Sequence, residues 1–166
     1  MELKQEFIDF APVGFTGTKY WEGTFKGRRF LAEPMYGKIE LFSYEGLSSL
    51  SEHWYNKYYS TTVTASELDD LVECKMYATY KGIEYEVDSV APRFANIILS
   101  GRNGHEQEDL DLGFRLSRPD AYSGIIRKRV EIEDIDSIRV EKRNVYEEYL
   151  NKKIITVNGK TFFSKD

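Results

Sequence analysis

The chain contains one short pattern twice. Residues 21–32 read WEGTFKGRRFLA and residues 76–87 read MYATYKGIEYEV. An aromatic residue, a lysine and a glycine occur in the same order in both, and Gly27 of the first copy corresponds to Gly82 of the second. In the second copy, aromatic and apolar residues also alternate with polar ones around the glycine. Glycine tolerates the positive φ of tight hairpin turns. The duplication therefore predicts two similar β-units, each opening with a hairpin.

The similarity continues after the hairpins. Residues 37–45 (GKIELFSYE) and 94–101 (FANIILSG) each have the pattern of a third strand. Residues 61–71 (TTVTASELDDL) then match residues 128–138 (KRVEIEDIDSI), with Val63 on Val130 and Leu68 on Ile135. Apolar residues at i and i+3 in SELDDL and EDIDSI predict a single 3₁₀ turn before a closing strand.

The second copy carries an insertion. The offset between the copies grows from 55 residues at the hairpin glycines to 67 at Val63 and Val130, which leaves 12 additional residues between about Leu99 and Ile126. This part of the chain holds GRNGHEQEDLDLG (101–113), which is polar and glycine-rich. Such composition predicts an exposed insertion loop.

The two ends of the chain have a different character. Residues 143–153 (RNVYEEYLNKK) predict a short helix with Val145 and Tyr149 facing inward. Asn158-Gly159 within IITVNGKTFF (154–163) is a strong hairpin signal, for either a truncated third unit or a strand pair that caps the second unit. The first 20 residues, which contain Phe7, Phe10 and Phe15, are expected to wrap the first unit.

The order of hairpin, third strand, loop, fourth strand, 3₁₀ turn and closing strand resembles the SH3-like and Tudor-like small barrels. The expected fold is all-β with a minor helical segment: two tandem small β-barrel repeats packed together, and a C-terminal β-hairpin. The expected boundaries are 1–20, 21–73, 74–142 and 143–166. Because a barrel of about 55 residues buries little core by itself, and no Pro- or Gly-rich linker separates the two, we expect them to share an interface.

The charge narrows the range of partners. The net charge is −5 and the pI about 5.2, which argues against nucleic-acid binding and is compatible with a basic protein partner. An acidic balance is also an ordinary means of keeping a protein soluble. The first ten residues lack the apolar region of a secretion signal, and no run of 18 apolar residues occurs. A cytoplasmic protein without membrane association is expected.

Catalytic patterns are scarce. His53 and His105 lie far apart without a metal-ligand spacing or a neighbouring nucleophile, and no phosphate-binding glycine loop occurs. Cys74 lies in an alternating apolar run that predicts a buried, inert thiol. Asp109-x-Asp111 lacks the glycine and terminal glutamate of a calcium loop. The sequence therefore predicts no enzyme, no cofactor and no metal site.

Two segments are candidates for binding a partner. The aromatic segment HWYNKYY (53–59) contributes Trp54, Tyr55 and Tyr58, residue types that dominate interface energies. They would also suit a Tudor-like aromatic cage for a methylated side chain. The insertion contributes four carboxylates that would steer a basic partner: Glu106, Glu108, Asp109 and Asp111.

With ATYKGIEYEV and EDIDSI, the chain is similar to tandem small-barrel proteins of bacteria, some of which accompany toxin loci as immunity proteins. This resemblance implies a protein-binding inhibitor that occludes a basic toxin or nuclease stoichiometrically. A Tudor-like module that reads a peptide or a nucleic acid through an aromatic pocket is the alternative. A structural role is not separable from the first hypothesis on sequence.

Overall fold

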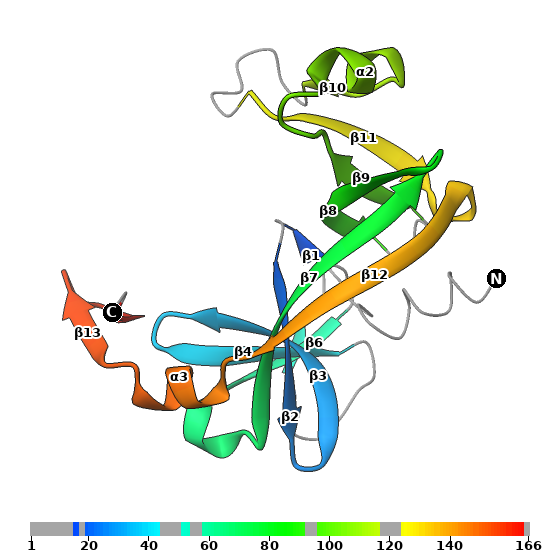
Figure 1. Cartoon of the computed structure of the whole chain (residues 1–166). Coiled ribbons are helices and arrows are strands. Elements are labelled where there is room, and N and C mark those ends of the chain that lie inside the picture. The colour runs from blue at the N-terminus through cyan, green and yellow to red at the C-terminus, as the bar shows by residue number, and fades with distance from the viewer. Residues whose placement is uncertain are drawn as a thin grey trace. The chain divides into compact units, whose positions relative to one another are not determined.

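The computed structural model describes residues 15–16, 19–43, 51–53, 58–91, 96–116 and 124–164. These residues form mainly β-strands, and every strand pair with a determined register is antiparallel (Figure 1). Within these ranges, two short helices and two 3₁₀ turns accompany the strands. The expected all-β class with a minor helical part is confirmed.

The chain divides into two compact modules. The first module comprises Tyr20–Cys74 and Lys142–Asp166, and the second comprises Met1–Lys19 and Lys75–Glu141. Strands β7 (Asp70–Tyr80) and β12 (Ile135–Asn144) each begin in one module and end in the other. The rigid packing of the two units that the sequence led us to expect stays a prediction.

The first module has the strand order β7-β2-β3-β4-β6-β5 (Figure 1). Its elements before β7 are β2 (Tyr20–Phe25), β3 (Arg28–Met35), β4 (Lys38–Ser43), β5 (Ser51–His53), β6 (Tyr58–Val63) and the 3₁₀ turn η1 (Ala65–Glu67). The alternation of apolar residues along these strands places Ile39, Leu41 and Leu71 in a core, where none of the three is exposed to solvent.

The second module has the strand order β10-β11-β9-β8-β7, and β12 also pairs with β7. Its elements after β7 are β8 (Ile83–Ala91), β9 (Asn96–Ser100), α2 (Glu106–Asp111), β10 (Arg115–Leu116), β11 (Ile126–Glu131) and the 3₁₀ turn η3 (Ile132–Asp134). Among the described strands, neither module's pairings close into a ring.

The short strand β1 (Phe15–Thr16) pairs with Val90 and Ser89 of β8 in the second module. The expectation that the N-terminal segment wraps the first unit is therefore wrong for these two residues. These two residues pair with the backbone of β8 in the second module, and nothing in their own sequence indicates this partner. Phe7 and Phe10 lie outside the described residues.

The duplicated phrase forms the same turn in both modules. Lys26 and Gly27 join β2 to β3 with φ values of 50° and 76°, and Lys81 and Gly82 join β7 to β8 with 50° and 77°. Positive φ at both central residues is the geometry that fits the twist of a two-residue hairpin. The two predicted hairpin turns are confirmed, and so are the two 3₁₀ turns before β7 and β12.

The C-terminal segment packs on the first module. After β12 the buried Val145 donates its backbone N–H to the carbonyl of Leu71 at 2.9 Å, and the helix α3 (Tyr146–Asn151) begins. The hairpin of β13 (Ile154–Val157) and β14 (Lys160–Phe163) follows, with Phe163 against the core of the first module. The helix and hairpin are confirmed, whereas the alternative that the hairpin caps the second unit is wrong. The reason is that β12 ends in the first module.

If the two turns are equivalent, Gly27→Ala and Gly82→Ala will each lower the free energy of unfolding by about 1–2 kcal/mol, because an L-residue is strained at this positive φ. No atom outside the turn would touch either new methyl group, so backbone strain is the only cost. Urea denaturation measures both values.

Gly23→Ala is the matched control. Its φ is not in the left-handed region, and an added Cβ would lie at least 3.5 Å from Leu41, Leu68 and Ala32. We expect a change below about 0.5 kcal/mol in this variant. A neutral Gly82→Ala beside a costly Gly27→Ala would show that the two turns are not equivalent.

Candidate functional site

The inserted segment is an ordered helix. The sequence predicted an exposed polar loop here, but residues Glu106–Asp111 form α2 (Figure 1), and the side chain of Asp109 is fully buried. The loop prediction is therefore wrong for this stretch. The reason is tertiary: a carboxylate enters the module interior, where hydrogen-bond donors from other elements meet it.

Three groups donate to the Asp109 carboxylate. The Tyr85 hydroxyl on β8 lies 2.8 Å from Oδ1, and Nη2 of Arg102 lies 2.9 Å from the same oxygen. The backbone N–H of Arg102 donates to Oδ2 at 2.7 Å. A buried charge is tolerated only when it is paired and hydrogen-bonded, and Asp109 satisfies both conditions.

The network shifts the acidity of its members. Burial by itself would raise the pKa of the Asp109 carboxyl, but the hydrogen bonds from Arg102 and Tyr85 outweigh burial and hold that pKa below its ordinary value. Burial, followed by the hydrogen bond to Asp109, raises the pKa of the Tyr85 hydroxyl to about 12. Asp109 is thus an anion and Tyr85 a neutral donor at neutral pH.

Aromatic packing also stabilises the Asp109 network. Phe114, which follows α2, is completely buried and stacks on the Tyr85 ring with centroids 4.8 Å apart. The Arg102 guanidinium lies 5.3 Å from the same ring. At the start of the inserted segment, the Gly101 N–H donates to the Ile126 carbonyl at 2.7 Å. Both ends of the insertion are therefore anchored, and α2 is held in place.

The other three predicted acidic residues lie on the exposed surface of α2. Glu106 accepts a hydrogen bond from the Gly104 N–H at 3.0 Å, and Gln107 donates to Asp111 at 3.0 Å. The Glu108 side chain is 66% exposed and lies 3.3 Å from Arg102. The structure therefore brings Glu106, Glu108 and Asp111 together on one helix and assigns Asp109 to the interior.

The aromatic candidates are less completely described. Trp54 and Tyr55 lie outside the described residues, and Tyr58 is the first residue of β6, with its side chain outside the description. Their role in binding stays a prediction. Of the two histidines, His105 is exposed and lies 3.4 Å from Glu108, while the side chain of His53 is also outside the description.

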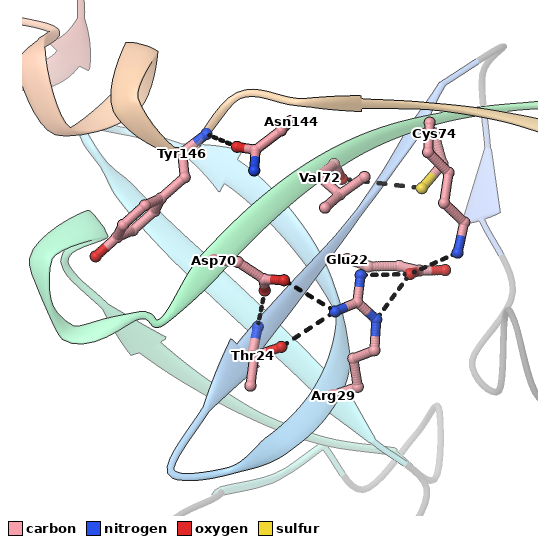
Figure 2. A network of polar contacts seen from close by, with 9 residues as sticks. Glu22, Thr24, Arg29, Asp70, Val72, Cys74, Asn144 and Tyr146 are labelled. Carbon is pink, nitrogen blue, oxygen red and sulfur yellow. Dashed lines mark hydrogen bonds and ion pairs between the residues drawn. The ribbon is translucent and has the colours of Figure 1, made fainter.

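Sequence reasoning missed a polar network in the first module (Figure 2). The buried Glu22 carboxylate on β2 lies 2.9 Å from Arg29 Nη2 and 3.5 Å from Lys142 Nζ. Arg29 also contacts Asp70 at 3.1 Å, and Asp70 accepts the Thr24 N–H at 3.0 Å. The sequence signal for this network was Glu22 itself, because a charged residue two positions after the buried Tyr20 faces the same side of the strand.

Cys74 lies beside this network as a buried thiol. Its side chain is fully buried, and burial raises the pKa of the thiol to about 12. The predicted burial of Cys74 is therefore confirmed, and the raised pKa agrees with the expected inert thiol because the thiolate is the reactive form. The Glu22 network joins β2, β3, β7 and β12 through side chains, and Cys74 takes no part in it as a thiolate.

Within the described ranges, no three His, Cys, Asp or Glu side chains converge in a way that could hold a metal ion. No helix in this part of the chain has the length and apolar character needed to cross a membrane. No family model matches the chain, and neither a curated protein nor a solved structure shows a match to it.

The structure predicts unequal effects for two neighbouring aspartates. Asp109→Asn will lower the free energy of unfolding by about 2–3 kcal/mol, because it leaves Arg102 without its buried counter-charge. Asp111→Asn, on the exposed surface of the same helix, will change it by less than about 0.5 kcal/mol. Equal values for the two variants in urea denaturation would contradict the assigned burial.

The effect of Asp109 will also depend on pH. Because the pKa of Asp109 is lower in the folded chain than in the unfolded chain, its ionisation stabilises the fold above the ordinary aspartate pKa of about 3.9. That contribution is lost as the pH falls through the folded-state pKa. The stability difference between wild type and Asp109→Asn will therefore shrink below about pH 5, measured by urea denaturation at several pH values. A difference that stays constant would contradict the lowered pKa.

Proposed function

We propose that each module is a small barrel of the SH3-like or Tudor-like type. A hairpin opens each module, a 3₁₀ turn stands directly before the last strand, and that last strand pairs back: β7 with β2, and β12 with β7. This shared order supports the proposal. Small barrels serve many unrelated functions, so the fold does not select one.

We further propose that the chain is a protein-binding inhibitor of the immunity type, which occludes a basic toxin or nuclease by stoichiometric binding. The observation that supports this most is the anchored acidic helix: Glu106, Glu108 and Asp111 stand on α2, which the buried Asp109 holds in place. A surface that is ordered before binding loses less conformational freedom on association.

Charge provides the proposed mechanism. The exposed acids of α2 attract a basic surface over a distance and speed the encounter. Where that basic surface is the substrate site of a nuclease, the three carboxylates occupy positions that the phosphates of the nucleic acid would take.

The test begins with the full chain as bait in the cells that encode it, with elution by salt and identification of the bound protein. The triple variant Glu106→Lys, Glu108→Lys, Asp111→Lys will weaken binding of that purified protein by about tenfold or more, because it reverses the charge of the docking face. Wild-type chain added in equimolar amount will abolish the nuclease or toxic activity of the bound protein. Calorimetry and an activity assay measure the two effects.

The control variant reverses three exposed acids away from α2: Glu131→Lys, Asp134→Lys and Glu147→Lys. It has the same total charge as the triple variant, so a loss of binding in both would show only a general charge effect. Unchanged affinity in the α2 variant, or a bound protein without any activity to inhibit, would refute the proposal.

A further inference from the structure

The C-terminal hairpin exposes strand β13 along its whole length. Ile154, Ile155 and Val157 are 57%, 43% and 50% exposed, whereas the side chains of β14 residues Thr161–Phe163 are partly buried. Among the described strands, only β14 pairs with β13. An apolar edge strand of this kind is a template on which another strand can form.

The register identifies the backbone groups that are available. Val157 and Lys160 flank the two-residue turn, so they form a hydrogen-bonded pair, and such pairs alternate along the hairpin. The Ser164 N–H donates to the Lys153 carbonyl at 2.7 Å, which agrees with this alternation. The N–H and C=O groups of Ile154 and Thr156 therefore point away from β14, toward the open edge.

The hairpin is held firmly on the first module. A Cβ placed on Gly37 would lie 3.0 Å from Thr161 Cγ2 and 3.1 Å from Ile154 Cγ2, so the hairpin sits directly on the Tyr36-Gly37 turn. The Phe163 ring meets the Tyr149 ring edge-on with centroids 5.1 Å apart. The edge is thus ordered before any partner binds, which lowers the entropic cost of strand addition.

Charge identifies the partner. Residues 152–164 contain Lys152, Lys153 and Lys160 and no acidic residue, although the whole chain is acidic. Lys153, just before β13, and Lys160, the β14 residue opposite Val157 at the other end of β13, are both exposed. Lys152 pairs with Glu148 at 3.8 Å, but a second copy of β13 would still bring Lys153 and Lys160 of both copies to one interface, which is unfavourable. An acidic strand meets opposite charge at both ends.

We propose that β13 is a docking site for an extended acidic segment of another protein, which adds to the hairpin as a third, outer strand. Its backbone pairs with the N–H and C=O groups of Ile154 and Thr156. Its apolar side chains cover Ile155 and Val157, and its carboxylates meet Lys153 and Lys160. This site is separate from α2 and takes a partner of the opposite charge.

The test uses the full chain and two labelled seven-residue peptides in fluorescence anisotropy. Both peptides carry Val at positions 3 and 5 and Ser at the even positions, while positions 1 and 7 are Glu in the acidic peptide and Lys in the basic one. The apolar and charged side chains then share one face of the added strand, as Lys153, Ile155 and Val157 share one face of β13. The acidic peptide will bind about tenfold more tightly than the basic one. Thr156→Pro will weaken its binding about tenfold, because proline removes the outward N–H and obstructs the edge. Thr156→Val keeps that N–H and will leave the affinity within twofold.

A second variant covers the case in which proline disturbs the hairpin. Lys153→Glu with Lys160→Glu keeps every backbone group and will also weaken the acidic peptide about tenfold. Equal binding of both peptides, no detectable binding of either, or full binding by both variants would overturn the proposal. Sedimentation that shows a dimer abolished by Thr156→Pro would replace it with self-association.

Discussion

Both modules depend on one uninterrupted strand. The first half of β7 pairs with β2 from Asp70 to Cys74, and its second half pairs with β8 from Tyr77 to Tyr80. The backbone hydrogen bonds of both ladders therefore require a single strand to stay extended over eleven residues. The burial alternation changes phase between Leu71 and Cys74: Leu71 is buried in the first core, whereas the buried residues that follow it on β7 are Cys74, Met76, Ala78 and Tyr80.

In each module a buried carboxylate holds together segments that lie apart in the sequence. Glu22 draws Arg29 and Lys142 to one oxygen in the first module, and Asp109 draws Tyr85 and Arg102 together in the second. An ion is stable in an interior only when donors surround it, so each carboxylate specifies which segments meet. In the second module the result is a fixed helix whose outer surface carries three further acids. Within the six residues of α2, acidic side chains therefore have two roles: Asp109 stabilises the interior, and the other three are exposed.

Much of the local structure was predictable. Lys-Gly and Asn-Gly turns between alternating residues indicated three hairpins, and the spacing of apolar residues in SELDDL and EDIDSI indicated the 3₁₀ turns. These are short-range signals, because a turn or one 3₁₀ turn depends on neighbouring φ angles and side chains. The fourth such turn, at Tyr36 and Gly37, was missed, since an aromatic residue with φ of 54° is uncommon. Among the candidate acids, composition could not separate Asp109 from Asp111.

By itself, the sequence determined the repeat, the all-β class, the closing helix and hairpin, and the burial of Cys74, because each follows from short local patterns of residues. Only the tertiary structure decided that β1 and the C-terminal hairpin belong to the modules distant from them in sequence, and that Asp109 supports α2 from within. These outcomes rest on hydrogen bonds and packing between segments far apart in the chain. Local pattern carries no information about such pairings, since many segments offer the same donors and apolar faces.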